Sequence, residues 1–122
     1  MHFTVALVIL AFFILLFAIL KRSGKISSGS AQAYLKSGAL LVDVRSPVEF
    51  DSGHLPNAIN LPFQDIATPL PPRFEDPNQV ILLHCRSGMR SIVAAKKLQR
   101  MGYTHAYNLG SYSRATRLVN AH

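Results

Sequence analysis

The chain has 122 residues, with 13 Lys and Arg against 6 Asp and Glu, five His and a single Cys. This length provides for one small domain and little else, and a lone cysteine excludes a disulfide framework. The formal charge of +7 does not indicate a nucleic-acid partner, because the sequence has no basic stripe with interleaved aromatic residues. The largest basic group of the C-terminal half, Lys96, Lys97 and Arg100, suits the dipole at the end of a predicted helix.

The first 20 residues are predicted to form a transmembrane anchor. Every residue from Phe3 to Leu20 except Thr4 is apolar, and the run contains no Gly, Pro or charge. Eighteen helical residues extend about 27 Å, close to the ~30 Å hydrocarbon core of a bilayer. A cleaved signal peptide is the alternative, but no Lys or Arg precedes the run and no small-x-small cleavage pattern follows it. We therefore expect residues 1–20 to cross the lipid bilayer once.

The residues after this span predict the orientation of the chain. Lys21, Arg22 and Lys25 follow the span directly, whereas only His2 and the amino terminus precede it. The positive-inside rule then places the following domain, residues 30–122, on the cytoplasmic face of the inner membrane. A single cysteine agrees with that reducing compartment. Residues 21–29 are expected to be a polar tether that, as a coil, averages on the order of 17 Å.

The segments that follow alternate between helix and strand. We predict a helix over 30–37, a strand over 40–44, a helix over 47–51, a strand over 58–61 and a proline-rich loop over 68–77, then a strand over 80–83, a helix over 91–101, a strand over 105–109 and one or two helical turns over 114–120. The second of these helices has a start signal, because Ser46 can be the N-cap, Pro47 the first helical residue and Glu49 the partner in a capping box. This alternation predicts an α/β fold with a mostly parallel sheet flanked by helices, preceded by one transmembrane helix.

The segment from His84 to Ser91 carries the chemistry. It holds the only cysteine, Cys85, between an apolar strand and a helix, and Gly88 permits a sharp turn that aims backbone N–H groups at the thiol. A helix N-terminus has unpaired donors and about half a positive charge, which favours a thiolate and can hold an anionic substrate. Arg86 and Arg90 add positive charge beside the cysteine.

This loop resembles the active-site loop of a rhodanese, or thiosulfate sulfurtransferase, domain. Two upstream stretches agree with the resemblance and occur in the family order. Residues 41–45 read Leu-Val-Asp-Val-Arg, and residues 53–62 resemble the family's Gly-His-Ile-Pro-Gly-Ala signature, with Asn57 where Gly is usual. The resemblance implies the three-layer rhodanese-like fold and a sulfurtransferase that uses neither cofactor nor metal.

The resemblance also implies roles for the site residues. Cys85 attacks the sulfane sulfur of a thiosulfate-like anion, becomes a persulfide and passes the sulfur to cyanide, a thiol or a protein sulfur carrier. The donor is expected to bind to Arg86, Ser87, Gly88, Met89, Arg90 and Ser91, with Ser91 also a possible N-cap of its helix. Asp43 and Arg45 are expected to support the loop, and Arg45 is expected to pair with Glu49.

Two other functions stay open at this point. Phosphatases and arsenate reductases on the same fold have a Cys-x5-Arg loop, one residue longer than the Cys-x4-Arg of Cys85 to Arg90. A non-catalytic, membrane-tethered interaction module is the second alternative, although such modules commonly lose the cysteine. Residues 111–122 depart from the family, which usually has Gly-Gly and a Trp after the last strand, where this chain has Gly110-Ser111 and no Trp.

Overall fold

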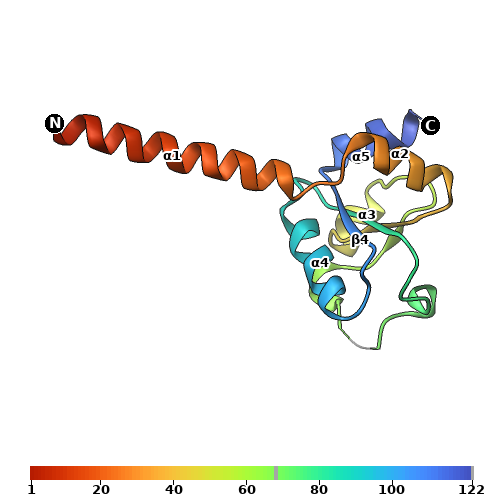
Figure 1. Cartoon of the computed structure of the whole chain (residues 1–122). Helices are drawn as coiled ribbons and strands as arrows, with labels where there is room; N and C mark the ends of the chain where they lie inside the picture. The colour runs from red at the N-terminus through yellow and green to blue at the C-terminus, as the bar shows by residue number, and fades with distance from the viewer. Residues whose placement is uncertain (68, 122) are drawn as a thin grey trace.

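The computed structural model describes residues 1–67 and 69–121, with the side chains of residues 20–23 left aside. Residue 68 of the predicted loop, residue 122 of the predicted domain, and the Lys21 and Arg22 side chains that set the predicted orientation thus lie outside the described part. The chain has two parts: a long N-terminal helix, α1 (His2–Ser23), and an α/β domain from which this helix projects (Figure 1).

Four parallel strands form the sheet of the domain. They are β1 (Leu40–Asp43), β2 (Ile59–Asn60), β3 (Ile81–His84) and β4 (Ala106–Gly110), in the spatial order β2-β1-β3-β4. The two central strands are in register, with Leu40 opposite Ile81 and Asp43 opposite His84. Because all strands are parallel, the residues at the carboxyl ends of β1, β3 and β4 meet at one edge of the sheet, and Cys85 lies at that edge.

Helices cover both faces of this sheet and produce two apolar cores. On one face α4 (Met89–Arg100) packs its Ala94, Ala95 and Leu98 against Val42 and Leu83. On the other face α2 (Ser28–Lys36) and α5 (Tyr112–Asn120) lie together and cover the side chains of alternate strand residues (Figure 1). Strands buried on both faces read as continuous apolar runs, as predicted for residues 40–44. The predicted three-layer α/β fold is confirmed.

The short elements follow their local sequence signals. The helix α3 (Pro47–Asp51) begins as predicted, since the Ser46 side chain accepts from the Glu49 N–H and the Glu49 carboxylate accepts from the Ser46 N–H. In the described part of the segment between β2 and β3 there are two 3₁₀ turns, Phe63–Asp65 and Pro72–Phe74. The second of them lies within the segment that was expected to be irregular.

The connection between α1 and the domain is shorter than the predicted tether. Helix α1 continues to Ser23 and α2 begins at Ser28, so residues 24–27 alone connect them. This connection is bonded to the domain: the Ile26 N–H donates to Asn108 O at 2.9 Å, and the Arg114 guanidinium donates to Ile26 O at 2.6 Å. A free coil over residues 21–29 is therefore wrong, because these bonds hold the segment against the edge of β4.

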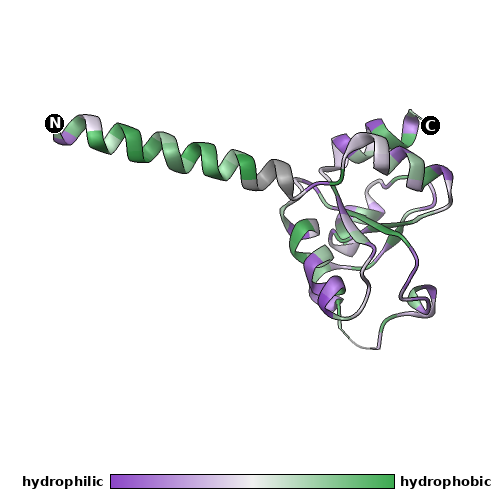
Figure 2. Cartoon of the chain, in the orientation of Figure 1, coloured by the Kyte–Doolittle hydropathy of each residue, from purple (hydrophilic) through white to green (hydrophobic). Residues whose placement is uncertain are grey.

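Helix α1 is long and apolar enough to span a membrane. Residues His2–Ile19 have a mean hydropathy of 2.8, and this segment is exposed along its whole length. The apolar colouring continues around and along the helix, in contrast to the mixed surface of the domain (Figure 2). A helix that is apolar on every side suits a lipid environment.

Candidate active site

The loop after β3 turns directly into α4 and surrounds Cys85. Gly88 is the N-cap of α4, with a φ of 93° that a residue with a Cβ adopts only with strain. A Cβ at Gly88 would also lie 3.3 Å from the carbonyl carbon of Gly110. The prediction of Ser91 as N-cap was wrong: α4 starts two residues earlier, at Met89, because Gly88 supplies the turn and Ser91 already belongs to the helix.

Cys85 is fully buried at the centre of this loop. The Gly88 N–H donates to Cys85 Sγ at 3.1 Å, and Ser91 Oγ lies 3.5 Å from the same sulfur. Burial raises the pKa of the thiol, but hydrogen bonds from Ser91, Gly88 and Ser87 outweigh burial and bring the pKa below its ordinary value. The loop therefore favours a thiolate at Cys85.

A buried amide braces this arrangement from β4. Asn108 Oδ1 accepts from Ser91 Oγ at 2.6 Å and from the Gly110 N–H at 3.0 Å, while Asn108 Nδ2 donates to Gly88 O at 3.4 Å. A hydroxyl has one hydrogen, so Ser91 Oγ can donate either to Asn108 Oδ1 or to Cys85 Sγ. The sequence analysis missed Asn108. Its only sequence signal is that it is a polar residue within a buried strand.

Arg90, predicted to bind the substrate, forms an ion pair with Glu49 of α3. Its two terminal nitrogens donate to the Glu49 carboxylate at 2.8 and 3.1 Å. The hydrogen bonds from Arg90 and from the Ser46 N–H lower the pKa of Glu49 to about 2. Glu49, and to a smaller extent the charge of a Cys85 thiolate, raise the pKa of the Arg90 guanidinium. The site thus contains a carboxylate within its cationic rim.

Asp43 and Arg45 pair with each other at the carboxyl end of β1. Arg45 Nε donates to both carboxylate oxygens at 3.0 Å, and a terminal nitrogen donates to Oδ2 at 2.8 Å. The predicted pairing of Arg45 with Glu49 is wrong, because Asp43 is buried directly beside Arg45 and Glu49 is held by Arg90. Arg45 further donates to Gly53 O at 2.7 Å and stacks on the Tyr112 ring at 4.6 Å.

His84 precedes the cysteine but is directed into the fold. Its Nε2 lies 3.9 Å from Asp43 Oδ2, and its ring packs edge-on against Tyr112. Burial lowers the pKa of His84 more than the neighbouring Asp43 carboxylate raises it, so the ring is neutral at pH 7. Neither ring nitrogen has a hydrogen-bond partner within the described residues. The geometry makes His84 a buried neighbour of the Asp43–Arg45 pair.

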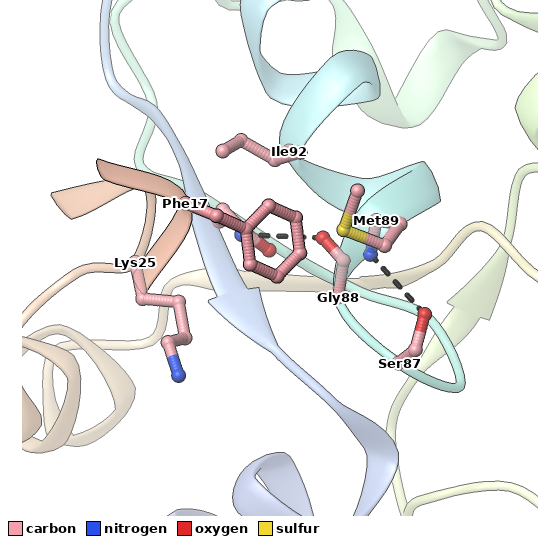
Figure 3. Close-up of a pocket in the computed structure, with 7 residues that line it drawn as sticks. Phe17, Lys25, Ser87, Gly88, Met89 and Ile92 are labelled. Carbon is pink, nitrogen blue, oxygen red and sulfur yellow. Dashed lines mark hydrogen bonds between the residues drawn. The ribbon is translucent and has the colours of Figure 1, made fainter. Parts of the chain in front are cut away.

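Two cavities flank the loop. A polar cavity of about 400 Å³ is lined by Arg45, Glu49, Ser52, Arg86, Tyr112 and Ser113. It contains two arginines near the cysteine, and Arg86 is exposed there. A smaller and mainly apolar cavity lies on the other side, between the loop and α1 (Figure 3). Within residues 1–67 and 69–121, no three His, Cys, Asp or Glu side chains are grouped as metal ligands would be.

Comparison with known proteins gives a consistent result. A family model described as the rhodanese-like domain matches residues 27–115. The thiosulfate sulfurtransferase PspE of Escherichia coli strain K12 is 33% identical over 69 residues, which cover 57% of this chain and 66%, just under two thirds, of that protein. The thiosulfate sulfurtransferase GlpE of Pseudomonas syringae is 34% identical over 85 residues, covering 70% of this chain and 78% of that protein.

Among solved structures, the human single-domain sulfurtransferase TSTD1 has a similar fold. The two share 27% sequence identity with a TM-score of 0.66, and the similarity covers 77% of this chain and 96% of the human one. The part of this chain without a counterpart is therefore about a quarter of its length, in keeping with the matched family domain starting only at residue 27.

Proposed function

We propose that this chain, which belongs to the rhodanese-like domain family, is a thiosulfate sulfurtransferase that carries sulfur as a persulfide on Cys85. The observation that carries the proposal is the surrounding of Cys85 Sγ by donors, above all the Gly88 N–H at 3.1 Å. These donors lower the pKa of the thiol and stabilise its anion. The relatives named thiosulfate sulfurtransferases support the same reaction class.

The reaction proceeds in two displacements. The Cys85 thiolate attacks the outer sulfur of thiosulfate, a Cys–S bond to that sulfur forms, and the S–S bond of thiosulfate breaks as sulfite leaves with the electron pair. The acceptor, a thiolate or cyanide, then attacks the outer sulfur of the persulfide and releases the Cys85 thiolate. Each electron pair is accounted for, so neither step requires an external oxidant, a metal or a cofactor.

The residues around the loop are proposed to bind the donor anion. Arg86, which lines the polar cavity and is exposed there, supplies positive charge for the sulfonate end. The backbone N–H groups of Ser87, Gly88, Met89 and Ser91 supply donors near the reacting sulfur. Arg90 also contributes to the donor site. Its ion pair with Glu49 neutralises most of its charge, so its attraction for the anion is weaker than that of an unpaired arginine.

We further propose that α1 anchors the enzyme in the inner membrane with the domain in the cytoplasm. The support is the exposed apolar surface of α1 and the basic residues that follow the apolar run in the sequence. The anchor then holds the site close to the bilayer, because only residues 24–27 separate α1 from α2.

The deciding experiment is the Cys85→Ser variant beside the parent chain. The parent should gain one sulfur atom on Cys85 after exposure to thiosulfate, seen by intact mass, and should form thiocyanate from thiosulfate and cyanide. Cys85→Ser should do neither while keeping its cooperative unfolding transition. Thiocyanate formation by Cys85→Ser would contradict the mechanism.

The same preparation distinguishes the two alternatives. Turnover of an aryl phosphate by the parent at a rate comparable to thiosulfate would favour the phosphatase, and the absence of both activities would favour an interaction module. We expect neither, because the short Cys-x4-Arg loop retains the cysteine and its donors but lacks the extra residue of the phosphatase loop.

A further inference from the structure

The second cavity beside the catalytic loop lies between the domain and the membrane helix. Its volume is about 240 Å³, and it is lined by Phe17 of α1, by Lys25, by Ser87 and Gly88 of the loop, by Met89 and Ile92 of α4, and by Asn108 of β4. Figure 3 shows the Phe17 ring in front of the loop, with Met89 and Ile92 on its α4 side and Lys25 on the other. Most of the surface that faces the cavity is carbon.

Only one peptide separates this cavity from the reacting sulfur. Gly88 lines the cavity and donates its N–H to Cys85 Sγ at 3.1 Å. The two neighbours of Gly88 in the sequence, Ser87 and Met89, are exposed and line the cavity as well. A molecule seated in the cavity therefore lies beside the loop that holds the persulfide in the proposed reaction.

The surroundings of the cavity are apolar where the domain approaches the membrane helix. Within the described residues after α1, the large apolar side chains that are strongly exposed are Val48, Met89 and Val93, and of these Met89 lines the cavity. Phe17 lies in the last turn of the apolar segment His2–Ile19. The opening of the cavity is therefore at the level where a spanning α1 leaves the hydrocarbon core.

These observations define the chemistry of a ligand. An apolar wall favours an alkyl chain, with a gain of about 0.8 kcal/mol for each CH₂ removed from water. Among the residues whose side chains are described, Lys25 is the charged one that lines the cavity, and its ammonium favours an anionic head group such as a thiolate. Thiosulfate, a small dianion without apolar surface, suits the polar cavity on the other side of the loop and not this one.

We propose that the cavity between α1 and the catalytic loop binds the alkyl chain of an amphiphilic thiol that reaches the enzyme from the bilayer and accepts its sulfur. The proposal rests on the sulfurtransferase function given above. In the transfer, the thiolate of the bound amphiphile attacks the outer sulfur of the Cys85 persulfide. The Cys85–sulfur bond to that atom breaks, the Cys85 thiolate leaves with the electron pair, and the amphiphile becomes an alkyl persulfide.

The test uses the full chain in phosphatidylcholine vesicles with thiosulfate as donor and butanethiol, octanethiol or cyanide as acceptor. Phe17→Ala removes one wall of the cavity, and Phe13→Ala, one turn earlier on the same exposed helix, is the matched control. Both variants experience the same partitioning of octanethiol into the bilayer. We expect the preference for octanethiol over butanethiol in kcat/KM to fall about tenfold in Phe17→Ala, to stay unchanged in Phe13→Ala, and cyanide turnover to stay unchanged in both.

A second measurement detects binding without transfer. Full-length Cys85→Ser in the same vesicles is irradiated with an alkyl diazirine that carries a terminal thiol, and mass spectrometry locates the label. Labelling at Phe17, Met89 or Ile92 is expected. Equal acceptor preference in the two Phe variants, or labelling confined to the rest of α1, would overturn the proposal while cyanide turnover persists. Absence of cyanide turnover in the parent would instead refute the sulfurtransferase function, and the acceptor assignment with it.

Discussion

Replacing Gly88 with Ala tests how the loop activates Cys85. Gly88 has a φ of 93°, and a Cβ there would lie 3.3 Å from Gly110 C and 3.4 Å from Gly110 Cα. Gly38 provides the matched control, because its φ of 87° is similar and a Cβ there would meet no atom within 4 Å. The two substitutions share the backbone strain and differ in the crowding and in the contact with Cys85.

The expected magnitudes follow from these differences. A left-handed φ costs an alanine about 1–2 kcal/mol, offset by about 0.4–1 kcal/mol from the lower entropy of the unfolded chain. Gly38→Ala should therefore lower the free energy of unfolding by about 1 kcal/mol. Gly88→Ala should lower it by about 2–4 kcal/mol, because the crowding against Gly110 adds roughly 1–3 kcal/mol. Hydrogen bonds to charged groups contribute about 1.5–3 kcal/mol, so partial loss of the N–H to Sγ contact should raise the pKa of Cys85.

The assay combines urea denaturation with the pH dependence of alkylation of Cys85 by iodoacetamide, on full-length protein in detergent micelles. Gly88→Ala should shift the alkylation midpoint upward and reduce thiosulfate turnover, while Gly38→Ala leaves both unchanged. If Gly88→Ala lowers stability but leaves the alkylation midpoint in place, the Gly88 N–H does not stabilise the thiolate and the reasoning is refuted.

Two further predictions concern the neighbours of the loop. Glu49→Gln should lower the KM for thiosulfate several-fold with little change in kcat, because it removes the carboxylate that neutralises Arg90; an unchanged or higher KM in steady-state assays would show that Arg90 does not attract the anion. Burial holds the pKa of His84 below its unfolded value of about 6.5. The unfolded state therefore binds the extra proton on acidification, and the free energy of unfolding should fall from pH 7.5 to 5.5, by at most about 1.4 kcal/mol per pH unit. Equal stability at the two pH values in urea titrations would contradict this burial effect.

Much of the fold follows from local patterns in the sequence. The continuous apolar runs of β1 and β3 predict strands covered on both faces, and the capping signal from Ser46 to Glu49 predicts the start of α3. The loop around Cys85 is likewise a local feature, because strand, cysteine, glycine and helix follow one another within a dozen residues. Because the cysteine directly follows a strand, the position of the loop at the edge of the sheet was predictable from the sequence.

The partners of the site residues were not predictable in the same way. Arg90 and Glu49 are 41 residues apart, and Asn108 follows Ser91 by 17, so only the packed sheet brings them together. Glu49 is within reach of Arg45 in the sequence, which suggested the wrong pair. Burial decides the outcome, since the fully buried Asp43 requires a cation and Arg45 is the neighbour that supplies it.

The pairing of Asp43 with Arg45 leads to one more prediction, in which the sign of a pH effect reverses. In the parent, Arg45 neutralises the charge of Asp43. The Asp43 carboxylate, 3.9 Å from His84 Nε2, therefore attracts a proton on the buried imidazole too weakly to keep it charged. Arg45→Met leaves Asp43 buried and unpaired, which costs about 3–5 kcal/mol at pH 7.5.

A proton bound by the Asp43–His84 pair would then restore neutrality inside the fold. The folded variant should bind this proton at a pH above the ordinary pKa of a histidine. Its free energy of unfolding should therefore rise as the pH falls from 7.5 to 5.5, opposite to the parent. Urea denaturation of the parent, Arg45→Met and Arg45→Met/His84→Asn at both pH values measures this change, and the double variant shows how much of the rise requires the imidazole. Loss of stability on acidification of Arg45→Met, as in the parent, would mean that Arg45 does not control the charge of this buried cluster.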